Sequence, residues 1–259
     1  MRRNRIILPI AVLFILGIAV FLAITMRGTP EPQAEAPAPT EPETEPAEPT
    51  IPPSYMIDGV EVLFQDEYSA GCETYACTML LQTLGFDMDE HTMLDYLDIH
   101  WVYYGEDGQR YGPDMYSAQA GDIYTGWGVY CTAMARYMNS YLADAGSDMK
   151  ATAMEGVPLR ELCERYISKG IPVMVWATTW MLEPYEKDSW IVNYVDENAH
   201  YQLGDTFTWL QNEHCLLLIG YDEENYYFAD SCAGEVSEFS RELCEKRYSQ
   251  LGEQSIAVE

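Results

Sequence analysis

The chain has 259 residues, of which 48% are hydrophobic, so it is long enough for one or two domains with a sizeable core. It carries 42 Asp and Glu residues against 14 Lys and Arg residues, a formal net charge of −28. This balance argues against binding to nucleic acid, because phosphate contacts need clustered cations, and against adhesion to anionic lipid surfaces. We interpret the acidic charge mainly as a feature that keeps the surface solvated.

An uncharged apolar run stands near the start of the sequence. Arg2, Arg3 and Arg5 precede the 21 residues from Ile6 to Met26, which would span about 31 Å as a helix. The exit "AITMRGT" is a poor cleavage site, so residues 1–28 are predicted to be a signal anchor that crosses the cell membrane once. The positive-inside bias then predicts an extracytoplasmic location for the rest. The alternative, an unusually long cleaved signal, leads to the same compartment.

A segment rich in proline and glutamate follows the apolar run. Residues 29–53 hold nine of the 14 prolines, and their other residues are almost all Glu, Ala, Thr and Gln. Such a composition buries little apolar surface, so we predict a disordered, extended stalk. Residues 54–259 contain no internal repeat and no second linker, and they are predicted to form one domain.

The first half of this domain is predicted to be helical. Apolar residues recur at intervals of three and four over residues 72–84, with Gly85 as a stop signal and Ser69 as a plausible N-cap. A shorter helix is predicted over residues 90–97 and a longer one over residues 126–146. Another helix follows in "VPLRELCERYISKG", which opens with a proline and closes with Gly170.

The second half changes to a strand pattern. "IPVMVWAT", residues 171–178, is a short run with high β-propensity, and "HCLLLIGYD" and "NYYFAD" form a predicted hairpin over residues 214–230. A last helix is expected over residues 240–251, followed by a strand in "QSIAVE". Helices first and antiparallel strands second indicate an α+β fold, with a helical lobe against a sheet lobe.

The cysteines lie entirely within the predicted domain. There are seven, an odd number, so at least one thiol lacks an intrachain partner even if disulfides form in the outer compartment. No CxxC and no paired Cys/His spacing occurs, and the sequence therefore indicates no metal site. No cofactor motif is present either.

Cys72 differs from the other six cysteines in its place along the chain. It lies where a loop turns into the predicted helix, directly after Gly71. A helix N-terminus lowers the pKa of a cysteine and favours the nucleophilic thiolate. Cys72 is therefore the candidate nucleophile, and the alternative is a buried structural cysteine.

A cysteine nucleophile needs a histidine base and an acceptor that orients the histidine. His214 opens the most hydrophobic strand, and Asp230 ends its hairpin partner, so the two are expected to lie roughly opposite each other. The alternative is a strand-end histidine and a turn aspartate without a catalytic role. Gln65, seven residues before Cys72, is placed to donate its side-chain amide to an oxyanion, together with the backbone N–H of Cys72.

Five segments, in order, resemble one peptidase family. "FQDEYSAGCETYACTMLLQTLGF" is similar to the glutamine-to-cysteine segment of papain-like cysteine peptidases. It most resembles cysteine peptidase family 39, the double-glycine leader peptidase-like group, in its extracytoplasmic single-domain branch. The further segments are "GPDMYSAQAGDIYTGWGVYCTAMARYM", "GIPVMVWAT", "EHCLLLIGYDEENYYFADS" and "RYSQLGEQSIAV". The resemblance covers about residues 60–258 and implies a papain-like fold, with its helical lobe and nucleophile helix on an antiparallel sheet lobe.

The resemblance also implies the roles of the site residues: Cys72 the nucleophile, His214 the base, Asp230 its orienter and Gln65 the oxyanion donor. One departure is "ADS", where the family often has Asp followed by Pro. The chain also has no GxxxxGK[ST] motif, so the transporter-linked leader processing of the wider family does not transfer automatically.

The sequence thus predicts a membrane-anchored peptidase or amidase that hydrolyses a peptide or protein substrate through a thioester. Two alternatives remain: a non-catalytic domain that binds peptides or cell wall, and an acyltransferase that uses the same triad.

Overall fold

A computed structural model describes residues 51–259 of the chain. The predicted signal anchor and most of the predicted stalk lie outside these residues. Within them, no helix has both the length and the apolar character needed to cross a membrane. The end of the predicted stalk contacts the domain, because Ile51 packs against the core and the Tyr221 hydroxyl donates to the Pro52 carbonyl at 3.1 Å.

The centre of the domain is an antiparallel sheet in the order β12-β11-β10-β7-β13-β6, with β1 paired to β10 as well. Its strands are β1 (Tyr55–Met56), β6 (Ala151–Met154), β7 (Val173–Thr178), β10 (Glu213–Tyr221), β11 (Asn225–Asp230), β12 (Glu235–Ser240) and β13 (Ser255–Val258). The strands predicted from residues 171–178, 214–230 and 254–259 are β7, β10 with β11, and β13. All residues of β7 and β13 are buried, which explains their continuous apolar sequence.

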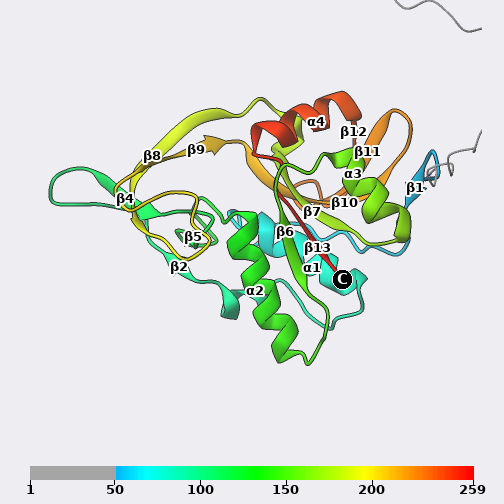
Figure 1. Cartoon of the computed structure of the whole chain (residues 1–259), viewed down its shortest axis with the longest axis horizontal. Coiled ribbons are helices and arrows are strands. Elements are labelled where there is room, and N and C mark those ends of the chain that lie inside the picture. Colours follow the sequence, from blue (N-terminus) through cyan, green and yellow to red (C-terminus); the bar gives the residue numbers. More distant parts are fainter. Residues whose placement is uncertain (1–50) are drawn as a thin grey trace, which may run out of the picture. The chain divides into compact units, whose positions relative to one another are not determined.

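Helices lie on both sides of this sheet (Figure 1). The helix α1 (Cys72–Thr83) packs against β10, β7 and β11, and α4 (Arg241–Gln250) packs against β7, β11 and β12. The helix α2 (Cys131–Asp144) contacts β6 and β13, and α3 (Leu159–Arg165) precedes β7. The fold is therefore α+β, as predicted.

A second region of strands was not predicted. The strands β3 (Tyr103–Tyr104), β4 (Arg110–Pro113), β8 (Tyr185–Tyr194) and β9 (Thr206–Gln211) form a four-stranded sheet, in which only the β4–β8 pair is parallel. The strands β2 (Ile99–His100) and β5 (Gln119–Ala120) form a short parallel pair. Figure 1 shows β4, β8 and β9 together at the left of the view, on the opposite side of the domain from β1.

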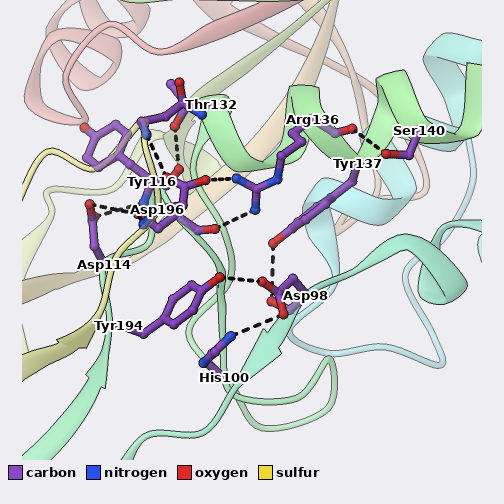
Figure 2. A network of polar contacts seen from close by, with 12 residues as sticks. Asp98, His100, Asp114, Tyr116, Thr132, Arg136, Tyr137, Ser140, Tyr194 and Asp196 are labelled. Carbon is purple, nitrogen blue, oxygen red and sulfur yellow. Dashed lines mark hydrogen bonds and ion pairs between the residues drawn. The ribbon is translucent and has the colours of Figure 1, made fainter.

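A polar network joins α2 to this second region (Figure 2). Arg136 on α2 forms an ion pair with Asp196, which follows β8. The neighbouring Tyr137 hydroxyl donates to the backbone carbonyl of Asp98 at 3.3 Å, and the Tyr194 hydroxyl donates to the Asp98 carboxylate at 3.0 Å. These contacts fix the loops around β2 and β8 on the helix.

Three predicted elements differ in detail. Residues 90–97 form a 3₁₀ turn, η1 (Thr92–Tyr96), rather than an α-helix. The helix predicted from Gly126 begins at Cys131, because residues 126–130 form a loop in which Gly128 has a φ of +95°. Ser69 is not the N-cap of α1; Gly71 holds that position, and the Ser69 hydroxyl donates to the backbone carbonyl of Tyr124 instead.

Candidate active site

Cys72 is the first residue of α1, the position that the sequence predicted. Its side chain is buried, with 8% of its surface exposed. The thiol donates to the Glu73 carboxylate at 3.3 Å, and Sγ accepts the backbone N–H of Cys215 at 3.4 Å. The helix α1 is thus held against the start of β10, where Cys215 directly follows His214 in the sequence.

Two carboxylates surround this thiol. The ligand atoms of Cys72, Glu73 and Glu213 all lie within 4.8 Å of one another. Glu73 is fixed because its other oxygen accepts the backbone N–H of Val129 at 2.9 Å. A Cβ at Gly128 would lie 2.3 Å from that same oxygen, which explains the glycine in the facing loop.

Burial and negative charge control the protonation of this group. Burial, followed by the charges of Glu73 and Glu213, raises the pKa of the Cys72 thiol well above its usual value. Burial also raises the pKa of Glu73, and burial with the neighbouring Glu73 charge raises that of Glu213. The structure therefore presents Cys72 as a protonated thiol.

His214 and Asp230 form the pair that the hairpin predicted. The Nε2 atom of His214 lies 2.9 Å from Oδ1 of Asp230, and both side chains are almost fully buried. Asp230 also accepts the Ser237 hydroxyl at 2.9 Å and the backbone N–H of Cys232 at 3.0 Å. Burial lowers the pKa of His214, but the hydrogen bond to Asp230 and the adjacent Cys232 raise it to about 10.

Gln65 lies on the same side as His214. Its Nε2 donates to the backbone carbonyl of Tyr68 at 2.8 Å, and its Oε1 accepts the Ser231 hydroxyl at 2.9 Å. Its backbone N–H donates to the Ser231 carbonyl at 2.8 Å. The "ADS" departure from the family pattern thus supplies the serine that anchors Gln65. One amide hydrogen of Gln65 remains for another acceptor, because an NH₂ group has two.

Cys232 occupies the other nitrogen of the imidazole. Its Sγ lies 3.9 Å from Nδ1 of His214 and 3.9 Å from Oε1 of Gln65. Within residues 51–259, no hydrogen bond joins the Cys72 thiol to His214; the sulfur next to the imidazole is that of Cys232. Glu213 and His214 are consecutive on β10, and consecutive strand side chains point to opposite faces. The side chains of Glu213, which lies with Cys72, and of His214 therefore point to opposite faces of β10.

A cleft of about 320 Å³ opens beside Glu213. Ser69 and Ala70, just before α1, also line it. Three tryptophans are part of its lining: Trp127, Trp180 and Trp209. Ligand sites are commonly concave and lined by aromatic side chains with a few polar groups, and this cleft fits that description.

The predicted residues are thus brought together in two groups. Gln65, His214 and Asp230 are in one contact network, and Cys72 joins it through the backbone of Cys215 rather than through the imidazole. Glu73, Glu213 and Cys232 were not predicted from the sequence. Glu73 could have been noticed as the neighbour of the candidate nucleophile, and Cys232 as a thiol two residues after the candidate orienting acid.

Each group also contains three side chains of the kinds that bind metals. The first is Cys72, Glu73 and Glu213, and the second is His214, Asp230 and Cys232. Within each group the donor atoms lie within 4.8 Å of one another. In the second group, however, the His214–Asp230 hydrogen bond already occupies one ring nitrogen and one carboxylate oxygen. All seven cysteines are free.

The helix-led α+β fold and the buried His–Asp pair define a papain-like domain. The model of the Peptidase C39 like family matches residues 57–256, and the chain belongs to that family. A crystal structure described as a C39-like peptidase from Bacillus anthracis is similar, with a TM-score of 0.65 and 25% identity. The match covers 80% of this chain and 97% of that one.

The uncharacterized protein YvpB of Bacillus subtilis (strain 168) is 22% identical over 191 residues, which are 73% of this chain and 69% of that protein. Together, these matches confirm the predicted family and fold.

Proposed function

We propose that this protein is a cysteine peptidase or amidase that hydrolyses a peptide bond through a thioester on Cys72. The observation that carries the proposal is the buried His214–Asp230 pair, at 2.9 Å, on the strand whose next backbone N–H contacts Cys72 Sγ. Family membership supports the same class of reaction.

The pair defines the direction of proton transfer. When His214 Nε2–H donates to Asp230, Nδ1 is the acceptor in the neutral form of the ring, and the pKa of about 10 makes that nitrogen a strong base. For catalysis, the Cys72 thiol leaves the Glu73 carboxylate and turns toward this nitrogen, by a rotation about its side-chain bond. Catalytic hydrogen bonds are often long or absent without substrate and form in the Michaelis complex.

The reaction then follows the triad sequence. The Cys72 thiolate attacks the scissile carbonyl carbon while its proton moves to His214 Nδ1, and a tetrahedral oxyanion forms. The backbone N–H of Cys72 and the second amide hydrogen of Gln65 are the proposed donors to that oxyanion. His214 returns the proton to the leaving amine, and water, deprotonated by His214, hydrolyses the thioester.

The proposed substrate is a peptide or protein that lies in the cleft lined by Trp127, Trp180 and Trp209. No cofactor or nucleic acid takes part in the proposal. From residues 1–28 we also infer a single-pass anchor that holds the catalytic domain outside the cytoplasm. This location rests on the sequence alone, and intact-mass measurement of the membrane fraction tests it: a mature N-terminus near Thr29 would contradict the anchor.

A peptide-library cleavage screen with the full-length chain tests the proposed activity. We expect cleaved products that disappear in the Cys72→Ala variant. Tight peptide binding without any product would instead support the alternative, a non-catalytic domain that binds peptides. The observation that favours this alternative is the raised pKa of Cys72, which keeps the thiol protonated. Products joined to an added amine would indicate acyl transfer.

A further inference from the structure

Cys232 has a position that the peptidase mechanism does not use. It follows Asp230 by two residues, in the turn between β11 and β12, and its backbone N–H donates to the Asp230 carboxylate at 3.0 Å. The same carboxylate holds Nε2 of His214 at 2.9 Å. Asp230 thus holds both the backbone of Cys232 and the imidazole, and Cys232 Sγ lies 3.9 Å from Nδ1.

Cys232 is also the accessible thiol of the chain. All seven cysteines lie within residues 51–259, and Cys232 is partly exposed whereas the other six are buried. Burial raises the thiol pKa of each of those six, which are Cys72, Cys77, Cys131, Cys163, Cys215 and Cys244. Buried, protonated thiols are inert toward solution reagents, so access and chemistry both favour Cys232.

The contacts of His214 can activate the Cys232 thiol. A thiol beside an imidazole can transfer its proton to the ring and become a thiolate, which is the reactive form. Asp230 stabilises the resulting imidazolium. Burial lowers the pKa of His214, but the hydrogen bond to Asp230 and the neighbouring Cys232 raise it to about 10. At Cys72, by contrast, burial and the charges of Glu73 and Glu213 oppose thiolate formation.

We propose that Cys232 is a modification site that reacts with low-molecular-weight disulfides through its pairing with His214. The Cys232 proton moves to Nδ1 of His214, and the thiolate attacks one sulfur of the disulfide. A Cys232–S–S–R bond forms, the reagent's S–S bond breaks, and the released RS⁻ takes up a proton from the imidazolium. Cys232 is oxidised, and one sulfur of the reagent is reduced to a thiol.

The modified residue would cover the candidate base. Because Cys232 Sγ already lies next to Nδ1 of His214, its new substituent would stand where the Cys72 thiol must arrive. Reversible loss of peptidase activity follows, and this consequence rests on the proposed function. The modification itself does not, because it requires only Cys232, His214 and Asp230.

Hydroxyethyl disulfide is a suitable probe, since it is neutral and the chain's charge of −28 would repel anionic reagents. The full-length chain is treated with one equivalent at about pH 7, and the modified cysteine is mapped by peptide fragmentation. We expect the mixed disulfide on Cys232 before any other cysteine. We expect His214→Gln to slow it by about tenfold, because an unpaired thiol is only a few per cent thiolate at this pH.

Cys72→Ser is the matched control, and we expect it to leave the rate at Cys232 unchanged. The pH profile of the wild-type rate is a second test, which remains valid even if the His214 variant does not fold. The titratable groups placed with Cys232 are His214 on β10 and Asp230 on β11, while Gln65 and Ser231 are neutral. Because proton transfer to His214 prepares the thiolate, we expect the wild-type rate to rise by less than tenfold per pH unit between about pH 6 and 8, whereas an unpaired thiol gains about tenfold per pH unit.

Modification of Cys72 first would overturn the proposal, as would a rate at Cys232 that rises tenfold per pH unit in the wild type. The enzymatic consequence is tested separately: a fully modified protein that still cleaves peptides refutes only the blocking of His214, and an unmodified protein without activity refutes only the proposed function.

Discussion

The two sides of the β10 start carry the same kind of reactive group in opposite electrostatic settings. On one side, the Cys72 thiol is buried against the carboxylates of Glu73 and Glu213 and stays protonated. On the other, Cys232 lies beside an imidazole whose pKa is raised to about 10. Burial and the two neighbouring carboxylates, rather than the position at a helix N-terminus, thus set the protonation of the Cys72 thiol.

This difference shows that a helix N-terminus alone does not lower the pKa of a cysteine enough to activate it. A helix N-terminus offers about half a positive charge. At Cys72 that charge is opposed by burial and by two carboxylates within a few ångströms, so the resting thiol is not activated. We therefore expect activation to accompany substrate entry, when Cys72 moves away from Glu73 and meets His214.

The largest expected effect comes from removing the nucleophile. In Cys72→Ala, kcat should fall by about 10⁶-fold, the scale known for the nucleophile of a catalytic triad. Cys77→Ala is the matched control, because Cys77 is a fully buried thiol on the same helix. It should lower the melting temperature without removing turnover. Loss of turnover in the Cys77 variant alone would reverse the assignment.

Removal of Asp230 should eliminate the hydrogen bond that orients His214. In Asp230→Ala, we expect kcat to fall by roughly 10²–10⁴-fold, the usual contribution of acid–base catalysis. The raised pKa of His214 stabilises the fold fully below about pH 6.5, and this contribution is lost as the pH rises through about 10. The variant should lack that decline, which denaturant unfolding at several pH values would measure. An identical pH dependence in both proteins would contradict the assigned pair.

Gln65→Ala separates an oxyanion role from a structural one. If the amide donates to the oxyanion, kcat should fall by roughly 10²–10³-fold with little change in KM. Because Gln65 also bonds Tyr68 and Ser231, some stability is lost as well. Ser231→Ala is the control that removes only one of these bonds. A similar loss of kcat in both variants would assign Gln65 to positioning alone.

The smallest expected effect comes from removing a charge beside Cys72. Glu73→Gln keeps the size of the side chain and an oxygen for the Val129 N–H, but removes one charge beside the thiol. We expect Cys72 to react with iodoacetamide about 3- to 10-fold faster at neutral pH, because its pKa falls. The rate at Cys232 should stay the same. No change at Cys72 would mean that burial alone holds the thiol protonated.

Much of the central sheet was predictable because its signals are local. The strands β7, β10 and β11 are short apolar runs, and α1 shows three- and four-residue spacing, so their positions follow from the sequence. The strand β8 was missed because charged residues interrupt its apolar positions in "YEKDSWIVNY". Its pairing also depends on contacts with β4, far away in the sequence.

The candidate site was predictable in its members more than in its arrangement. His214 and Asp230 meet because one hairpin places them, and this could be read from its length. The rotamer of Cys72 and the approach of Cys232 depend on loops that meet only in the folded chain. Glu213 precedes His214 in the sequence, but the fold places its carboxylate beside Cys72, where its charge raises the pKa of the thiol. Composition and spacing do not reveal this contact.

The most direct test is to find which thiol carries the acyl group during turnover. The full-length protein is mixed with a peptide ester from a sequence that the library screen identifies, quenched in acid, and mapped by peptide fragmentation. A thioester on Cys72, with Cys232 unmodified, is the predicted result. A thioester on Cys232 would contradict the assignment of Cys72 as the nucleophile and would place the catalytic thiol at the imidazole seen in the structure.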